Sequence, residues 1–278
     1  MITVRRMLSL AFTLSAATMG CLTSSAQAVV PSSIAALGDS YSAGLFSGAP
    51  CSAAAVCLAN SWSTGTNTAV NSHYLRMRAT NPKINGRYYT YAVSGRKVSD
   101  LTRQANLAVA QRVEYATVML GLNDSCRESE AAMTPVTTFR TQFAAGLGAL
   151  ARGLPKARIL VTSIPDAERL RVLYKDVAAA RSAWAAQQVC SVALANPLST
   201  AAADVARRTR ARQRVIDFNR QLAQVCALYA NCRYDNNAVF NWAFTRPAFV
   251  TRDYFHLSVA GQAGLASVSG AAGYRFVP

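Results

Sequence analysis

Two histidines are present in the chain, so the search for a catalytic base is short. His256 lies in "TRDYFHLSVAGQ", three residues after Asp253. Residues three apart in a turn or short helix face the same side, so this carboxylate can accept the Nδ1 proton of the imidazole. Nε2 is then left to accept a proton from a distant hydroxyl group. His73, in "NSHYLRMRA", has no acidic residue nearby and is interpreted as a surface or packing residue.

A serine that such a base could activate occurs in "IAALGDSYSAGL", residues 34–45. There a short apolar run ends at Gly38, Asp39 and Ser40. A lone Gly-Asp-Ser is typical of a turn or a helix cap. A serine whose proton is taken by an oriented histidine is instead a nucleophile that attacks carbonyl carbon. We therefore predict that Ser40 is the nucleophile, His256 the base and Asp253 the residue that orients it, while Asp39 braces the turn.

The tetrahedral intermediate of such a reaction needs hydrogen-bond donors aimed at its oxyanion. The sequence offers the backbone N–H groups of Ser40 and Gly95 and the side-chain amide of Asn123. Glycine lets a substrate oxygen approach the main chain closely, and a neutral amide does not lose its donors near neutral pH. Asp124 is expected to fix the loop that carries Asn123.

Alternating strands and helices must position these residues. Short runs rich in branched and aromatic residues, each ending in a turn signal, predict buried parallel strands near 32–38, 87–93, 115–122 and 157–165, with a weaker fifth near 232–237. Helical patterns cover 137–154 and 214–230, where apolar residues recur at steps of three and four. The alternation predicts one open, doubly wound α/β sheet.

The candidate residues follow the predicted strands at their carboxyl ends. Ser40 follows the first strand, Gly95 the second and Asn123 the third. Ligands of open α/β sheets bind outside the carboxyl ends of the strands. The separate segments are therefore expected to face one crevice.

The amino-terminal residues resemble an export signal. Arg5 and Arg6 precede a mostly apolar stretch, and "SSAQA" ends in a small-residue cleavage pattern. We expect a signal peptide over 1–28, a single catalytic domain over 29–278 and secretion. A lipoprotein anchored at Cys21 is the alternative. The apolar stretch is too short to span a bilayer, and no later segment predicts a transmembrane helix.

The chain is strongly basic, with a formal net charge of +16 that falls to +14 without Arg5 and Arg6. Five arginines crowd residues 207–214, and Arg96 and Lys97 adjoin the predicted oxyanion loop. This charge favours anionic targets such as phospholipid interfaces or acidic polymers, although a solvated arginine-rich helix face accounts for the arginines equally well. No nucleic-acid-binding module is recognisable.

Six cysteines remain after residue 28, an even set that suggests disulfides in an exported chain. Cys51 and Cys57, and likewise Cys226 and Cys232, are close enough to close small loops. Cys126 would then pair with Cys190 and pin the loop that carries Asn123. Metal ligation is disfavoured because the chain has no Cys-x-x-Cys and almost no histidine.

Together these motifs resemble the SGNH, or GDSL, hydrolase superfamily over most of residues 34–278. The name-giving residues match Ser40, Gly95, Asn123 and His256, in "ALGDSYSAG", "AVSGRKVSDL", "GLNDSC" and "RDYFHLS". Tyrosine replaces the eponymous leucine at 41, and leucine stands at 257 where many relatives have proline. "GLNDSC", "DYFHLSVAGQ" and "CRYDNNAVF" resemble the secreted bacterial esterase and phospholipase B-like branch.

The resemblance implies a three-layer α/β/α sandwich with a flavodoxin-like sheet, serine ester hydrolysis and no metal or other cofactor. The Gly-x-Ser-x-Gly elbow of α/β-hydrolases is absent from the sequence. The expected substrate is an ester, acyl lipid above all, and the expected state is a monomer. A carbohydrate-ester deacetylase of the same fold and a non-catalytic polyanion-binding protein are the alternatives, since fold alone does not choose a substrate.

Overall fold

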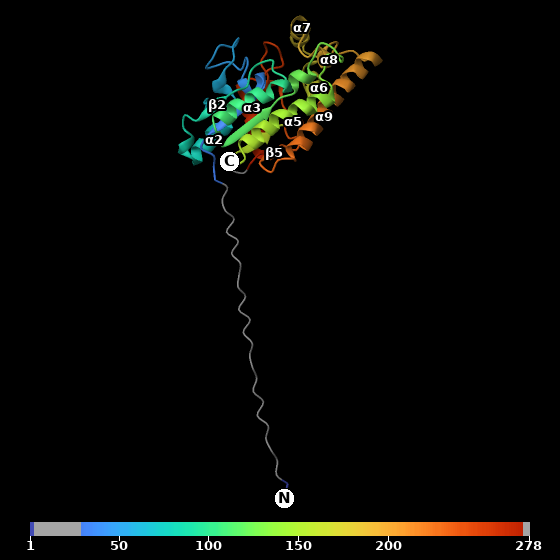
Figure 1. Ribbon diagram of the computed structural model, residues 1–278. Coiled ribbons are helices and arrows are strands. Elements are labelled where there is room, and N and C mark those ends of the chain that lie inside the picture. The colour runs from blue at the N-terminus through green and yellow to red at the C-terminus, as the bar shows by residue number, and fades with distance from the viewer. Residues whose placement is uncertain (3–28, 275–278) are drawn as a thin grey trace.

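Five parallel strands form the centre of the structure, a computed structural model in which residues 1–2 and 29–274 are described (Figure 1). Apart from its first two residues, the expected signal peptide lies outside the described residues, as does Cys21. The strands are β1 (Ile34–Gly38), β2 (Tyr88–Thr90), β3 (Tyr115–Met119), β4 (Arg158–Val161) and β5 (Cys232–Tyr234). Each lies within its predicted range.

The strand order is β2-β1-β3-β4-β5, and every neighbouring pair is parallel. This is the order of flavodoxin-like doubly wound sheets, so the predicted fold class is confirmed. The strands are shorter than predicted because buried apolar residues continue into the turns that follow them. Leu120 after β3 and Ile164 after β4 are examples.

Helices lie on both faces of the sheet and beyond the carboxyl ends of its strands (Figure 1). They are α1 (Ser40–Ala43), α2 (His73–Thr80), α3 (Leu101–Ala110), α4 (Leu122–Ser125), α5 (Val136–Gly153), α6 (Ala167–Tyr174), α7 (Ala178–Gln187), α8 (Ser191–Leu194), α9 (Ala202–Cys226) and α10 (Val259–Ala272). Helices α3, α5 and α9 lie side by side on one face (Figure 1). On the other face α2 and α10 meet through a hydrogen bond between His73 and Ser269.

The strands alternate their side chains between these two layers. Ala116 and Val118 of β3 pack in the large apolar cluster with α3, α5 and α9. Tyr115 of the same strand packs in a smaller cluster with residues of α2. Apolar side chains are therefore packed against both faces of the sheet. This packing fixes the strand ends that carry the candidate residues.

Helix α9 is longer than its predicted counterpart. Its apolar face is buried as expected and consists of Val215, Phe218, Leu222 and Val225. The helix starts at Ala202, twelve residues before the predicted start at 214. Its first half lacks the apolar periodicity on which the prediction depended. Helix α9 also ends at Cys226, where a disulfide to Cys232 accompanies the turn into β5.

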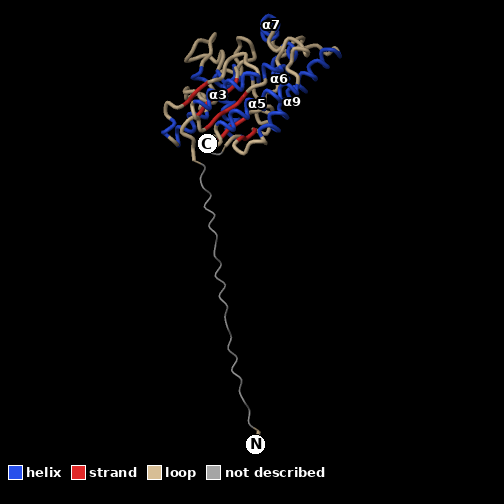
Figure 2. The backbone as a smooth tube through the Cα atoms, viewed as in Figure 1, coloured by secondary structure: helices blue, strands red, loops and turns tan. Residues whose placement is uncertain are grey.

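Loops gather at the upper end of the sheet in Figure 2, beyond the carboxyl ends of the strands. Three disulfides brace the structure and join Cys51 to Cys57, Cys126 to Cys190 and Cys226 to Cys232. Disulfides persist in oxidising compartments, so their number fits a protein that folds outside the cytosol. Within the described part of the chain, no helix has the length and apolar character needed to cross a bilayer.

Candidate active site

The turn after β1 presents Ser40 as the first residue of α1. Asp39 caps this helix, and its carboxylate accepts the Tyr41 N–H at 3.0 Å. The Gln104 side chain binds both backbone groups of Gly38, accepting from its N–H at 2.7 Å and donating to its carbonyl at 3.0 Å. A Cβ at Gly38 would lie 2.5 Å from the Ser42 hydroxyl, so the turn requires glycine there.

The loop before α10 brings the histidine and its carboxylate to this serine. His256 Nε2 lies 2.9 Å from Ser40 Oγ, and Nδ1 lies 2.6 Å from Asp253 Oδ2. The other carboxylate oxygen of Asp253 accepts the N–H groups of Phe255 and His256, each at 3.0 Å. Because a carboxylate only accepts hydrogen bonds, Nδ1 donates to Asp253 and Nε2 accepts from Ser40.

Electrostatics separate the two aspartates beside the serine. Burial by itself would raise the pKa of Asp253, but the hydrogen bonds that it accepts from the His256 side chain and from the backbone N–H groups of His256 and Phe255 hold that pKa below the ordinary value. Burial raises the pKa of Asp39 to about 7, against the opposing effect of its hydrogen bond from Tyr41. Near neutral pH Asp253 is therefore ionised, as an acid that orients an imidazole must be, whereas Asp39 is partly protonated.

Further hydrogen bonds tie the serine turn to the histidine loop. The Tyr41 hydroxyl donates to the Phe255 carbonyl at 2.7 Å. Gln262 of α10 donates to the Tyr41 carbonyl at 2.9 Å and accepts the Trp62 N–H at 3.0 Å. Sequence reasoning missed Gln262 and also Gln104. The only available signal for Gln262 was its position one helical turn into α10, because a glutamine in a helix is usually exposed.

Two of the predicted oxyanion donors are backbone N–H groups. Among the described residues, neither the Ser40 nor the Gly95 N–H has a hydrogen-bond acceptor. Gly95 has a φ of 77°, in the left-handed region that favours glycine, and no atom lies within 4 Å of where its Cβ would be. Gly95 is exposed, and the position that a Cβ would occupy there is open.

Asn123, in α4, reaches toward the same turn. Its amide nitrogen lies 3.3 Å from Asp39 Oδ2 and 3.1 Å from the Arg96 carbonyl. The neighbouring Asp124 accepts the Val98 N–H and the Thr134 hydroxyl, both at 2.8 Å. Asp124 thus holds the loop after β2 and the segment before α5 against the turn that carries Asn123.

The disulfide between Cys126 and Cys190 anchors this turn from the other side. Cys126 directly follows α4, and Cys190 directly precedes α8, 64 residues later in the chain. The Val192 N–H also donates to the Arg127 carbonyl at 2.9 Å. Helix α4, and with it Asn123, is thereby joined to the α6–α8 segment.

A narrow apolar crevice, with a volume of about 10 Å³, adjoins the candidate residues. The chain neighbours of Ser40, Asn123 and His256 all contribute to its wall, through Tyr41, Leu122, Phe255 and Leu257. The remaining lining comes from α6, the turn before it and the segment before α10: Pro165, Asp166, Ala167, Leu170, Trp242, Phe244 and Phe249. Sequence reasoning did not identify these residues, because their common location depends on how the loops fold.

The arginines of residues 207–214 bind other parts of the fold. Arg210 pairs with Glu130 at 2.6 Å and Arg212 with Asp166 at 2.8 Å. The other three donate to backbone carbonyl groups. Arg207 donates to Val192 and Ala195 and also pairs with Asp204. Arg208 donates to Asn196 and Ser199, and Arg214 donates to Thr134. Arg208 is buried, but Arg210 and Arg212 are 59% and 44% exposed, so the segment is in part the solvated arginine-rich face and in part a set of links within the fold.

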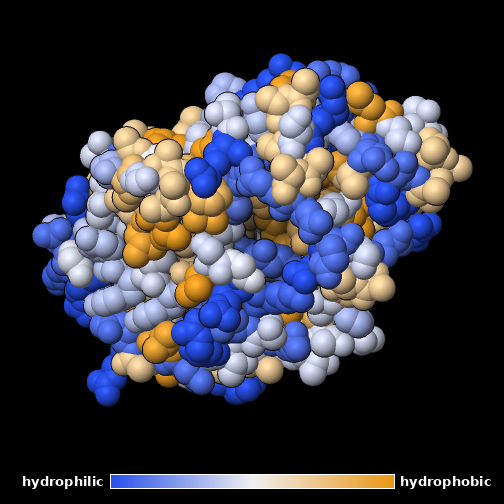
Figure 3. Space-filling view, turned by 90° about the horizontal axis from the view of Figure 1, so that it is seen from above, coloured by the Kyte–Doolittle hydropathy of each residue, from blue (hydrophilic) through white to orange (hydrophobic). Residues whose placement is uncertain are grey.

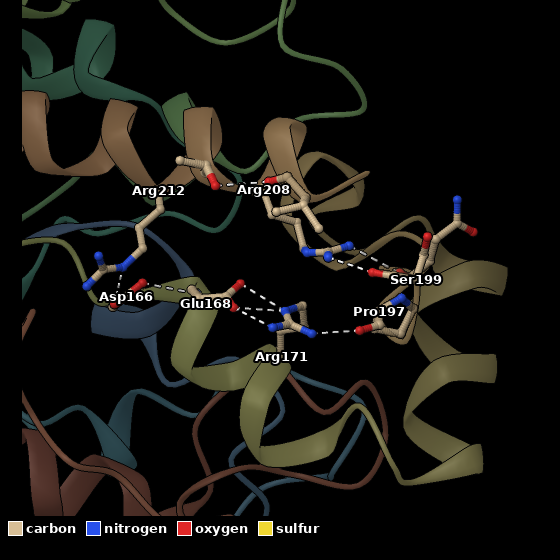
Figure 4. A network of polar contacts seen from close by, with 10 residues as sticks. Asp166, Glu168, Arg171, Pro197, Ser199, Arg208 and Arg212 are labelled. Atoms are coloured by element: carbon tan, nitrogen blue, oxygen red, sulfur yellow. Dashed lines mark hydrogen bonds and ion pairs between the residues drawn. The ribbon is translucent and has the colours of Figure 1, made fainter. Parts of the chain in front are cut away.

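Figure 4 shows the centre of this network between α6 and the start of α9. Arg208 is buried and donates to the Ser199 carbonyl at 2.7 Å. Across the same groove Arg171 pairs with Glu168 and donates to the Pro197 carbonyl, both within 2.7 Å. These guanidinium groups hold the loop before α9 against α6, which also bears part of the apolar crevice.

No grouping of three or more His, Cys, Asp or Glu side chains that could hold a metal ion occurs in the described ranges, 1–2 and 29–274. The side chains that meet at Ser40 form a hydrogen-bonded chain of acid, imidazole and hydroxyl. Such a chain can transfer a proton and generate a nucleophile at the Ser40 oxygen.

Solved structures resemble the chain at low sequence identity. The lipase Lip_vut3 from a goat rumen metagenome is 15% identical, with a TM-score of 0.53 over 88% of this chain and 99% of its own. An extracellular lipase from Streptomyces rimosus is 18% identical (TM-score 0.49, 86% and 99% covered). Phospholipase A1 from Streptomyces albidoflavus NA297 is also 18% identical (TM-score 0.48, 86% and 98% covered). At these identities the likeness concerns the fold.

The family relation comes from the sequence itself. No curated protein shows detectable similarity to the chain. The sequence profile of the GDSL-like Lipase/Acylhydrolase family, however, matches residues 36–263, a range that contains every candidate residue from Ser40 to His256. The chain therefore belongs to the GDSL-like lipase/acylhydrolase family and is a carboxylic ester hydrolase of that type.

Proposed function

We propose that the protein is a secreted esterase or lipase that cleaves acyl lipids, with Ser40 as nucleophile, His256 as general base and Asp253 as the residue that orients it. The observation that carries this proposal is the continuous hydrogen-bond chain from Asp253 through His256 to the Ser40 hydroxyl. Both links are short enough for proton transfer, and the carboxylate is itself fixed by two backbone N–H groups.

Acylation begins when Ser40 Oγ attacks the ester carbonyl carbon and its proton passes to His256 Nε2. The carbonyl oxygen then carries negative charge, which the N–H groups of Ser40 and Gly95 and the amide of Asn123 stabilise. His256 returns the proton to the leaving alcohol. Asp253 stabilises the imidazolium that forms in between without taking its proton.

Deacylation repeats the sequence with water in place of the alcohol. His256 takes a proton from water, the hydroxide oxygen attacks the acyl carbon, and the same donors bind the second oxyanion. Collapse of this intermediate releases the carboxylic acid and returns the proton to Ser40 Oγ. Each step uses groups that lie around one hydroxyl.

The apolar residues that pack beside Ser40 and His256 support acyl lipid as the substrate class, although the crevice between them, of about 10 Å³, must widen before it can hold an acyl chain. Its walls are mostly aromatic and aliphatic, and Tyr41 and Phe255 stand directly beside Ser40 and His256 in the chain. Apolar walls favour a hydrocarbon chain through burial of its surface. A sugar ester would need polar groups to bind its hydroxyls, and Asp166, the charged residue in the lining, is already paired with Arg212.

A p-nitrophenyl ester assay with and without a serine-directed phosphonate tests the proposal. We expect turnover that the phosphonate abolishes, with the label on the peptide that contains Ser40. Ser40→Ala should lower kcat by about 10⁶-fold, as loss of a triad serine does. Ser269→Ala, a matched change at the other serine that contacts a histidine, should keep kcat. Full activity in Ser40→Ala would refute the assignment, and inactivity of the wild type would favour the polyanion-binding alternative.

A panel of esters that vary in chain length and headgroup tests the substrate class. We expect acyl glycerols or phospholipids to be cleaved with higher kcat/KM than acetylated sugars. A preference for acetylated sugars would leave the assignment of Ser40 as nucleophile intact. It would reject acyl lipid as the substrate class in favour of carbohydrate esters.

A further inference from the structure

A long stretch without charge begins at the nucleophile. Between Asp39 and Arg76 the sequence has no Asp, Glu, Lys or Arg, although these residues make up 15% of the chain. Part of this stretch, which we call the 49–58 loop, is nevertheless exposed. Its exposed apolar residues are Ala49, Pro50, Ala53, Ala54, Ala55, Val56 and Leu58.

The 49–58 loop is held rigidly in this exposed position. The disulfide between Cys51 and Cys57 closes it. The Asn60 side chain donates to the carbonyls of Gly48 and Ala49, at 3.2 and 2.9 Å. The Phe46 N–H donates to the Ala55 carbonyl at 2.9 Å. These bonds keep apolar side chains in contact with water, where they gain no burial energy within the described chain.

The loop stands beside the candidate active site. The ring of Phe46, at its base, lies 5.3 Å from the ring of His256, edge to face. In Figure 1 the loop is the blue segment at the upper end of the molecule, beyond the carboxyl ends of the strands. Figure 3 looks onto this end and shows apolar surface, in orange, on raised parts around a central hollow.

Unpaired cations flank the same opening. The guanidinium of Arg252 lies 4.7 Å from the Phe46 ring centroid, and Arg96 and Lys97 follow Gly95 on the side of Asn123. Within the described residues none of these three cations forms an ion pair, in contrast to Arg207, Arg210 and Arg212 of α9. The nearby carboxylates of Asp39 and Asp253 are buried, so the opening carries positive charge at its surface.

We propose that the 49–58 loop is the part of the enzyme that docks on an anionic lipid surface, with Arg96, Lys97 and Arg252 binding the headgroups around it. This inference rests on the proposed function, since it assumes that the ester is presented in a lipid layer. An apolar element that enters the headgroup region gains energy from buried area, and nearby cations add attraction to anionic lipids. Docking there places Ser40 at the lipid surface.

Vesicle binding of the Ser40→Ala protein tests the inference without turnover. A second protein carries Val56→Asp and Leu58→Asp in addition to Ser40→Ala. The side chains of Val56 and Leu58 are 41% and 48% exposed, so both can be replaced with little effect on stability. We expect the wild-type loop to bind phosphatidylglycerol vesicles and the double variant to bind about tenfold or more weakly, because two charges replace inserted apolar groups. Thermal unfolding checks that both proteins are folded.

Leu228→Asp is the matched control. Leu228 is 68% exposed and lies between α9 and β5, at the amino ends of the strands and so away from the site. This change adds one negative charge, half of what the double variant adds, and should leave vesicle binding within about twofold. Equal loss in this control would attribute the effect to net charge and overturn the role of the loop.

Vesicles of different lipid composition test whether Arg96, Lys97 and Arg252 bind anionic headgroups. Binding should fall when phosphatidylcholine replaces phosphatidylglycerol, and Arg252→Gln with Lys97→Gln should remove most of that difference. Binding that is unaffected by the loop variants overturns the proposal. So does binding to a soluble acidic polysaccharide with no binding to vesicles, which identifies a polymer as the partner.

Hydrolysis of a soluble p-nitrophenyl ester separates this inference from the proposed function. Here the loop variants keep the intact Ser40, so that they can turn over substrate. The ratio of the rate of lipid hydrolysis in vesicles to the rate of soluble-ester hydrolysis should fall about tenfold, in line with the loss of binding. Loop variants that keep the wild-type ratio would refute the docking surface and leave the esterase standing. A wild type that cleaves neither substrate would refute the proposed function instead.

Discussion

His256 Nε2 lies 2.9 Å from the hydroxyl of Ser40, and His73 Nε2 lies 2.9 Å from the hydroxyl of Ser269. The chain thus contains two serine–histidine contacts of the same length. In the second, the Ser269 hydroxyl donates to the Leu265 carbonyl at 2.6 Å, so His73 Nε2 must be the donor to Ser269. His73 Nε2 therefore carries a proton, whereas a general base needs an unprotonated nitrogen facing the serine.

The group at the other ring nitrogen explains this difference. The Asp253 carboxylate accepts from Nδ1 of His256, whereas the Tyr115 hydroxyl lies 3.1 Å from Nδ1 of His73. A neutral imidazole has one donor, so His73 Nδ1 accepts from the tyrosine. The nitrogen that faces the serine is basic in one site and protonated in the other. A serine–histidine distance alone therefore does not identify a nucleophile.

Burial is the second difference. His73 is fully buried, and burial, with a contribution from the charge of Arg76, lowers its pKa to about 3. The side chain of His256 is 15% exposed, and its chain neighbours Phe255 and Leu257 line the apolar crevice. We interpret the His73 cluster as a bond between α2, β3 and α10, and the His256 cluster as the catalytic site.

Replacing each histidine by glutamine is the strongest test of this comparison. His256→Gln should lower kcat by about 10⁶-fold with a small change in Tm, because no other base faces Ser40. His73→Gln should keep kcat, because glutamine can still donate to Ser269 and accept from Tyr115. Steady-state kinetics and thermal unfolding of both variants are the measurements. Equal losses of kcat would abolish the distinction between the sites.

The groups at Nδ1 provide the next test. Asp253→Asn should lower kcat by about 10⁴-fold, because the amide favours the imidazole tautomer that has its proton on Nε2. Tyr115→Phe should instead cost about 1–3 kcal/mol of folding free energy and leave kcat unchanged, because it leaves a buried acceptor without its donor. Near-normal kcat in Asp253→Asn would point to Asp39 as the carboxylate that matters.

The predicted oxyanion donors provide a third test. The proposed function gives such donors to the site at Ser40 and none to the His73 cluster. Asn123→Ala should lower kcat by about 10²–10³-fold with little change in KM. Asn81, whose amide donates to the carbonyls of Val30 and Pro31 near α2, is the matched control. Asn81→Ala should affect Tm and not kcat. A large increase in KM for Asn123→Ala would indicate a role in substrate binding instead.

Much of the fold and of the site could be predicted from local patterns. Buried parallel strands are continuous apolar runs, and the rule that ligands bind at their carboxyl ends predicts that Ser40, Gly95 and Asn123 lie near one another. The structure brings Ser40, His256 and Asp253 within hydrogen-bond distance. Their catalytic roles remain predictions for the variants above.

The remaining features depend on tertiary contacts that no local pattern encodes. The polar residues around Arg208 in the sequence are typical of an exposed helix face. Arg208 is nevertheless buried, because the 196–199 loop folds over it and accepts its hydrogen bonds. The burial of His73 depends likewise on Tyr115 and Ser269, which are distant in the chain. The apolar crevice combines segments from four parts of the chain. Spacing predicts which residues share a face, but not what covers that face.

The smallest effect concerns the loss of stability in acid that the buried His73 causes. The folded-state pKa of His73, about 3, lies below the unfolded value near 6.5, so the unfolded chain binds more protons between these values. The stabilisation by neutral His73 is therefore complete above pH 6.5 and is lost as pH falls toward 3. Between pH 8 and pH 5 the loss is about 2 kcal/mol. His73→Gln should not suffer this loss.

The measurement is the free energy of unfolding of wild type and His73→Gln in urea at pH 8 and pH 5. Asp39 complicates the wild-type curve, because its pKa is raised to about 7 and its contribution decreases as pH rises through 7. Its effect between pH 5 and pH 8 thus opposes that of His73 and cancels in the difference between the two proteins. That difference should change by about 2 kcal/mol in favour of the variant at pH 5. A pH-independent difference would mean that His73 is protonated inside the fold, and the contrast with His256 would then rest on geometry alone.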